Sequence, residues 1–134
     1  MRPVEVFLSH SHHDRAMAGR VAEVLCAHGV SVWLSETNII GAQQWHDEIG
    51  AALKRCDWFI VLLSPEAASS KWVQRELRYA LEDDRYNNRI IPIRFRECDY
   101  QQLSWTLSAL QMVDLSGDFE SGYRDLLRIW GSGL

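Results

Sequence analysis

The hexapeptide Trp58–Leu63 is apolar at every position, and this places the strongest constraint on the fold. A strand without polar positions must be covered on both faces, as in parallel sheets enclosed by helices. Four further segments have strand composition: Val4–Ser9, Val30–Leu34, Arg89–Arg94 and Gln111–Leu115. Pro92 favours a place near the edge of the sheet for its strand, because proline has no N–H to donate.

The segments between these strands have helical periodicity. Their expected starts are Asp14 (as a cap), Trp45, Ser69 or Ser70, and Asp118. The first three helices are expected to end near Gly29, Cys56 and Asp84. A short turn begins at Ser64-Pro65. Parallel strands need long crossovers, so five strands alternating with helices predict a parallel α/β sheet.

Length and composition fit one globular domain spanning residues 1–134. The chain has 134 residues, of which 47% are hydrophobic and 24% charged, which excludes a disordered or collagen-like protein. Its longest apolar run is too short to cross a bilayer. A net charge of −4 without a basic cluster argues against nucleic-acid binding.

The termini and the cysteines bear on location. No apolar signal region follows Met1, so we expect a cytoplasmic protein. Cys26, Cys56 and Cys98 are widely spaced and fit reduced thiols, and Cys26 and Cys56 fall on apolar helical stripes where burial is expected. Residues 131–134 have the composition of a linker to a further domain.

In open α/β sheets ligands bind beyond the carboxyl ends of the strands. That edge is predicted to carry residues 9–14, the 35–44 loop and residues 64–66. The first of these loops has no glycine, so neither a dinucleotide fingerprint nor a P-loop is present. His10, His12 and His13 could suggest a metal site, but no cysteine or second histidine cluster completes a ligand set. A polar loop in which Asp14 caps the following helix is therefore preferred, and no metal is expected.

Glu76 is the sharpest local feature. Trp72, Glu76 and Ala80 are spaced four apart and share a helical face, where a carboxylate interrupts an otherwise apolar stripe. The simplest interpretation is a solvated charge paired with Lys71 or Arg75, and the spacing alone favours it.

Three ordered segments resemble the boxes of Toll/interleukin-1 receptor (TIR) domains. Val6–Ser11 with Asp14 is similar to the first box. Val32–Leu34 followed by Ile39–Ala42, Trp45 and Asp47–Ile49 is similar to the second strand and the BB loop, although the glycine here precedes the position usual in bacterial members. Ile60–Pro65 with Ser70–Val73 and Glu76-Leu77 is similar to the third box.

The resemblance implies a flavodoxin-like three-layer fold, with a five-stranded parallel sheet in the order 2-1-3-4-5 and helices on both faces. It is closest to bacterial effector-type members that cleave NAD⁺ to nicotinamide and ADP-ribose or a cyclic isomer. It therefore implies Glu76 as the catalytic residue. It also implies substrate contacts from Ser9, His10, Ser11, Gly41, Trp45 and Trp72.

The implied reaction needs one carboxylate and no cofactor. Nicotinamide leaves NAD⁺ as a neutral molecule, so it needs no general acid, unlike the alkoxide leaving group of a glycosidase. A carboxylate beside the ribose stabilises the developing positive charge, and an aromatic wall stacks against the leaving ring. The resemblance further implies self-association with other TIR domains and a role in immune defence or cell-death signalling.

Two other functions remain open at this stage. One is a non-catalytic module that signals only through TIR–TIR contact, a type that often lacks the glutamate. The other is a flavodoxin-like or nucleoside deoxyribosyltransferase-type domain, which shares the architecture but whose phosphate loop or catalytic pattern is not visible here.

Overall fold

The computed structural model describes residues 2–35 and 42–131, and within this part the side chains of residues 42–46 are not described. The order of elements along the chain is β1 (Glu5–Ser9), η1 (His12–Asp14), α1 (Arg15–Ala27), β2 (Ser31–Leu34), α2 (Ala42–Arg55), β3 (Trp58–Leu63), α3 (Pro65–Ala68), α4 (Lys71–Glu82), η2 (Asp84–Tyr86), β4 (Ile90–Arg94), η3 (Tyr100–Gln102), η4 (Trp105–Ala109), β5 (Val113–Asp114) and α5 (Phe119–Ile129). The 3₁₀ helices η1 to η4 are single turns or little more.

All strand pairs in the sheet are parallel, and the order is β2-β1-β3-β4-β5. This confirms the predicted 2-1-3-4-5 flavodoxin-like arrangement. β3 lies at the centre and is buried at all six positions, as its uniformly apolar sequence predicts.

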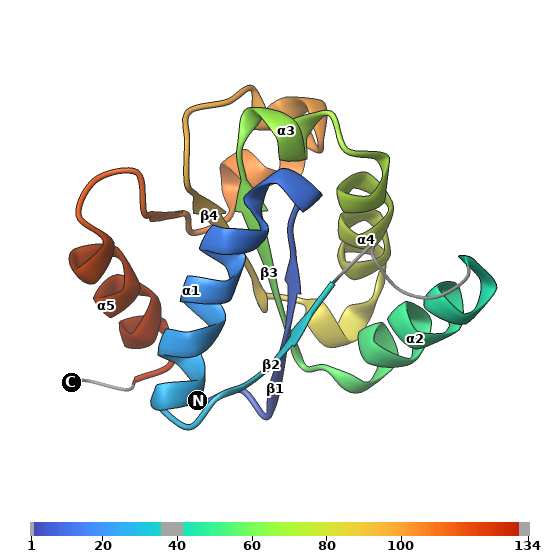
Figure 1. Ribbon diagram of the computed structural model, residues 1–134, viewed down its shortest axis with the longest axis horizontal. Helices are drawn as coiled ribbons and strands as arrows, with labels where there is room; N and C mark the ends of the chain where they lie inside the picture. Colours follow the sequence, from blue (N-terminus) through green and yellow to red (C-terminus); the bar gives the residue numbers. More distant parts are fainter. Residues whose placement is uncertain (1, 36–41, 132–134) are drawn as a thin grey trace.

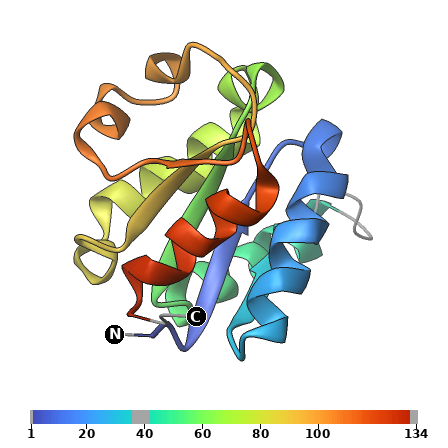
Figure 2. The same cartoon turned by 90° about the vertical axis from the view of Figure 1, so that its left-hand side faces the viewer.

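Helices cover both faces of the sheet (Figure 1). On one face α1 and α5 lie side by side, as Figure 2 shows, and enclose the core residues Val6, Leu8, Ile60 and Leu62. On the other face α2 and α4 enclose alternate residues of the same strands, among them Phe7 and Val61. The two clusters are the two halves of a three-layer core.

Pro92 explains why β5 is shorter than the predicted Gln111–Leu115 segment. Phe59 N donates to the Arg89 carbonyl at 2.9 Å, and Phe95 N donates to the Leu63 carbonyl at 3.0 Å, so odd-numbered positions of β4 face β3. Pro92 therefore faces β5 and cannot donate to it. Pairing between β4 and β5 begins one residue after Pro92, at Ile93. β4 is the strand next to the edge strand β5, in agreement with the position that the proline predicted.

The helix caps are mostly as expected. Ser70 rather than Ser69 caps α4, through a bond from Val73 N of 3.3 Å, and Asp118 caps α5 through Ser121 N at 3.2 Å. The expected burial of Cys26 is wrong: it follows the buried Leu25 on α1 but is exposed, because one helical step turns it away from the sheet.

Candidate functional site

Glu76 is buried, with 3% of its surface exposed. The Ser9 hydroxyl donates to its Oε1 at 2.7 Å, and the Ser35 hydroxyl donates to its Oε2. The expectation of a solvated charge paired with Lys71 or Arg75 is therefore wrong. A buried carboxylate whose two oxygens each accept a hydrogen bond has a fixed orientation.

Three elements bring these groups together. Ser9 ends β1 and Ser35 follows β2, and the two strands pair in parallel, so both hydroxyls lie at the carboxyl edge of the sheet. α4 packs Val73 and Leu77 against the sheet, which directs Glu76 inward toward that edge. The carboxylate thus lies where the topology of an open α/β sheet predicts a ligand.

Burial sets the charge state of Glu76. Removal from water raises the pKa of its carboxyl to about 7, and the hydrogen bonds from Ser35 and then Ser9 partly oppose this rise. Near neutral pH the group therefore exists in both protonation states. Within α4 it is a charged position that folding disfavours, which is typical of functional carboxyls.

Trp72 separates two surface hollows. A hollow of about 200 Å³ is lined by Ile49, Gly50, Leu53, Trp72, Arg75, Glu76 and Tyr79. A second hollow of about 420 Å³ is lined by Ser11, His12, His13, Glu66, Ser69, Ser70 and Trp72. The first is lined mainly by aliphatic and aromatic residues together with Glu76, and the residues that line the second are mainly polar. Trp72 and Glu76 share the first hollow, as their spacing on one helical face predicted.

The other predicted site residues differ in their placement. Ser9, His10 and Ser11 are all buried. The His10 ring donates from Nδ1 to the Ser11 carbonyl at 2.7 Å, which turns this nitrogen toward the backbone. Gly41 lies outside the described residues, as does the side chain of Trp45.

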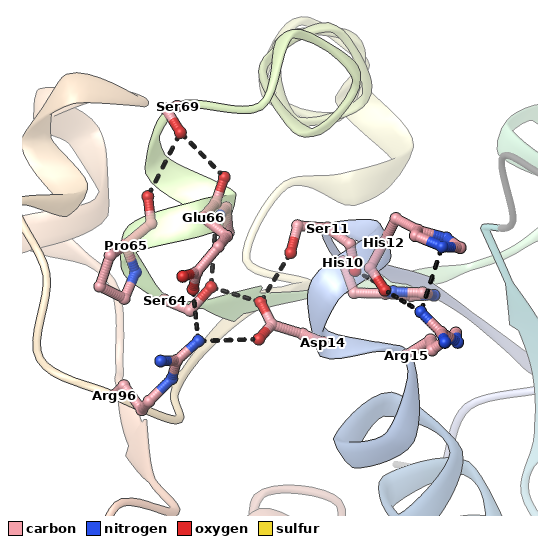
Figure 3. Close-up of polar contacts among 11 residues, drawn as sticks. His10, Ser11, His12, Asp14, Arg15, Ser64, Pro65, Glu66, Ser69 and Arg96 are labelled. Carbon is pink, nitrogen blue, oxygen red and sulfur yellow. Dashed lines mark hydrogen bonds and ion pairs between the residues drawn. The ribbon is translucent and has the colours of Figure 1, made fainter.

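Asp14 forms the centre of a second polar cluster (Figure 3). Its side chain is 1% exposed and accepts hydrogen bonds from Ser11 Oγ at 2.8 Å, from Ser64 Oγ and from Arg96 Nη2 at 3.3 Å. Arg96 also pairs with Glu66. The expectation that Asp14 caps α1 is half right: it occupies the cap position, but its side chain makes no capping bond. It instead joins the loop after β1 to the loops after β3 and β4.

Sequence reasoning placed Ser35 and Ser64 at this edge of the sheet but did not assign them as partners of Glu76 and Asp14, and it missed Arg96. The topology carried a usable signal for the two serines, since each directly follows a strand and therefore lies at the same edge as Ser9. Arg96 has no comparable signal, because its partner Asp14 lies 82 positions away.

The histidine-rich loop after β1 bears on the metal hypothesis. In the described part of the chain, no three histidine, cysteine or acidic side chains are grouped so as to hold a metal ion. The imidazole of His12 instead contacts Arg15, with His12 Nε2 and Arg15 Nη1 separated by 3.1 Å.

Among the described helices, none is long and apolar enough to span a membrane.

The fold and the site define a flavodoxin-like α/β domain with a buried carboxylate at the carboxyl edge of its sheet. Over residues 6–127 the sequence matches the family described as the TIR domain. The chain therefore belongs to the TIR domain family. No curated protein sequence is significantly similar to it.

Solved structures share the fold at low sequence identity. The TIR domain of the Toll-related receptor TRR-2 from Hydra magnipapillata has a TM-score of 0.74 and 19% identity, covering 92% of this chain and 95% of that one. The TIR domains of the activated Roq1 resistosome, which recognises the pathogen effector XopQ, have a TM-score of 0.74 and 16% identity over 95% and 99%. The Clostridium botulinum CMP N-glycosidase BcmB has a TM-score of 0.59 and 19% identity over 93% and 98%.

Proposed function

We propose that this TIR domain is an NAD⁺ nucleosidase, which cleaves the bond between nicotinamide and ribose and releases ADP-ribose or a cyclic isomer. The observation that carries the proposal is the carboxylate of Glu76, buried, held by two serine hydroxyls and shared with Trp72 in the wall of one hollow. A carboxylate that folding alone disfavours is a candidate for chemistry.

The reaction that we propose uses Glu76 as an electrostatic stabiliser. As the bond to nicotinamide breaks, positive charge develops on the ribose, and an ionised carboxylate fixed beside it lowers the energy of the transition state. Nicotinamide takes the bonding electrons and leaves as a neutral molecule. Water, or a nucleophilic atom of the adenine in the same substrate, then bonds to the ribose carbon, and the proton that it loses passes to the solvent.

The remaining residues are assigned supporting roles. Ser9 and Ser35 orient the carboxylate without neutralising it, because each donates to one of its oxygens. Trp72 supplies an aromatic face for the nicotinamide ring. Ser11 lines the hollow on the other side of Trp72, and His10, Gly41 and Trp45 complete the proposed set of substrate contacts.

Two structural neighbours support parts of this proposal. One is named an N-glycosidase acting on CMP, and so breaks a bond between a base and ribose, as we propose here. Another comes from an activated resistosome, which supports the proposal that this domain works by self-association with other TIR domains. We further propose a cytoplasmic protein of immune defence or cell-death signalling, with NAD⁺ as substrate and neither cofactor nor metal.

The test is nicotinamide release from NAD⁺ at high protein concentration or under crowding, so that self-association is not limiting. Glu76→Gln removes the charge and keeps the shape, and is expected to abolish release. Glu82→Gln is the matched control, since Glu82 is an exposed residue of the same helix. Equal turnover by wild type and Glu76→Gln would refute the assignment. Absence of turnover in every assembled state would favour a non-catalytic TIR–TIR interaction module.

A further inference from the structure

Arg75 lines the same hollow as the carboxylate of Glu76. It precedes Glu76 on α4, and successive helical residues are rotated by about 100° around the axis. The two side chains therefore approach the hollow from different directions: Glu76 is buried whereas Arg75 is exposed. The guanidinium carbon of Arg75 lies 5.2 Å from the centroid of the Trp72 ring, so the cation is held beside the aromatic wall.

Within the described part of the chain, Arg75 contacts the Trp72 ring but forms no ion pair with a carboxylate. Arg94 and Arg96, by contrast, each pair with a carboxylate. The hollow thus combines one buried acid at its inner wall with one exposed cation at its outer wall. A guanidinium binds phosphate in a planar two-point geometry, so this outer wall is chemically suited to a phosphate group.

We propose that Arg75 binds the 5′-phosphate of the ribose whose glycosidic bond faces Glu76, so that the hollow selects 5′-phosphorylated N-ribosides over free nucleosides. This inference rests on the proposed function and specifies its substrate class. The phosphate of such a substrate would be repelled by an ionised Glu76, and Arg75 offsets that repulsion while Glu76 acts at the other end of the ribose.

The test compares nicotinamide mononucleotide with nicotinamide riboside, two substrates that differ only in the 5′-phosphate. For wild type we expect kcat/KM to be higher for the mononucleotide. Arg75→Ala is expected to lower kcat/KM for the mononucleotide and for NAD⁺ by about tenfold or more, the usual effect of losing a charge-assisted hydrogen bond, and to leave the riboside nearly unchanged. Arg75→Lys should restore part of the difference.

Arg78→Ala is the matched control, because Arg78 is an exposed arginine of the same helix that lines a different hollow, with Gln74 and Leu103. It should leave both substrates unaffected. An equal loss for both substrates in Arg75→Ala would overturn the proposal, since it would mean that Arg75 only supports Trp72. An unchanged ratio between the substrates would overturn it as well.

Binding separates this inference from the proposed function. Calorimetry on the Glu76→Gln variant measures binding without turnover. It should give tighter binding of the mononucleotide than of the riboside, and adding Arg75→Ala should remove this difference. If wild type releases no nicotinamide but this binding difference is found, the phosphate site stands and the catalytic proposal fails. If no difference in binding is found, the phosphate site is refuted.

Discussion

Ser9 and Glu76 lie 67 positions apart in the sequence, and the serine hydroxyl donates a 2.7 Å hydrogen bond to the carboxylate. The contact joins the end of β1 to the middle of α4. It makes the first and third TIR boxes parts of one site, because each supplies one partner of a single buried bond. This arrangement has measurable consequences for both activity and stability.

Activity should rise with pH through neutrality. Stabilisation of positive charge requires ionised Glu76, and burial raises the pKa of its carboxyl to about 7. We therefore expect kcat/KM for nicotinamide release to increase between about pH 6 and pH 8, with a midpoint near 7. In the kcat profile the midpoint should be lower, because the cationic nicotinamide ring of bound substrate favours the ionised carboxylate. A flat or falling profile across this range would contradict the proposed role.

Ser35→Ala should move the same midpoint to higher pH. The hydrogen bond from Ser35 is the largest influence that lowers the Glu76 pKa, and its loss leaves the effect of burial less opposed. The measurement is the pH profile of kcat/KM beside wild type. Ser108→Ala is a control, because Ser108 accepts a 3.2 Å bond from Gln101 in an exposed position on η4. A midpoint that stays the same or moves down would count against this contact.

Glu76→Gln should stabilise the protein at alkaline pH and have little effect in acid. In the unfolded chain Glu76 ionises near the ordinary glutamate pKa of 4.5, whereas the folded group keeps its proton up to about pH 7. Between these two pKa values the native state binds more protons than the unfolded state, so the free energy of unfolding of the wild type falls as pH rises. Above about pH 7 the whole of this loss in stability is present. The glutamine variant does not carry this cost, which is at most about 3–4 kcal/mol at about 1.4 kcal/mol for each pKa unit.

Urea unfolding at pH 5 and pH 8 measures this difference. Glu82→Gln, at an exposed site on the same helix, should change stability little at either pH. A stability gain in Glu76→Gln of the same size at both pH values would show that the carboxyl titrates normally in the folded protein.

Arg96→Ala should destabilise the protein more than Arg94→Ala. Arg96 pairs with the buried carboxylate of Asp14, so its removal leaves a buried charge with only serine donors, at a cost of about 1–3 kcal/mol. Arg94 pairs with the exposed Asp114 at 3.0 Å, a contact worth less than about 1 kcal/mol. Thermal unfolding of the two variants provides the comparison, and equal losses would contradict a structural role for the Asp14 cluster.

Gly122→Ala and Gly19→Ala should change stability in opposite directions. A Cβ at Gly122 on α5 would lie 2.6 Å from the Asp114 carbonyl and would overlap the Leu115 side chain, so we expect a loss of about 1–3 kcal/mol. A Cβ at Gly19 on α1 meets no atom within 4 Å, so the higher helix propensity of alanine should give a gain of about 0.5–1 kcal/mol. Chemical denaturation resolves both. A gain in Gly122→Ala would contradict the described packing of α5 on β5, and a loss in Gly19→Ala would contradict the open space beside Gly19.

Most of the fold could be predicted because its signals are local. The apolar run of β3 and the capping residues Ser70 and Asp118 act through neighbours in the sequence, and each led to an element of the correct type. Strand order came from the resemblance to TIR domains rather than from periodicity. The start of β5 was predicted too early because it depends on which neighbour Pro92 faces, and this is a property of the assembled sheet.

The site was predicted in part. Trp72 and Glu76 were identified as a pair on one helical face, and they do share a hollow. Ser35 was placed at the edge of the sheet but not linked to Glu76, and Arg96 was not identified, since their partners Glu76 and Asp14 lie 41 and 82 positions away. Local spacing also made a surface charge the simplest interpretation of Glu76, because a helical pattern reports a face but not what covers it.

The sequence by itself determined that the chain alternates strands and helices and that a carboxylate interrupts an apolar stripe of α4. Only the tertiary structure decided that this carboxylate is buried, that Ser9 and Ser35 bind it and that its pKa lies near neutrality. The physical reason is the distance along the sequence over which each interaction acts. Hydrophobic periodicity and caps act over one or two helical turns, whereas desolvation and hydrogen bonding depend on which distant segments the sheet brings to its carboxyl edge.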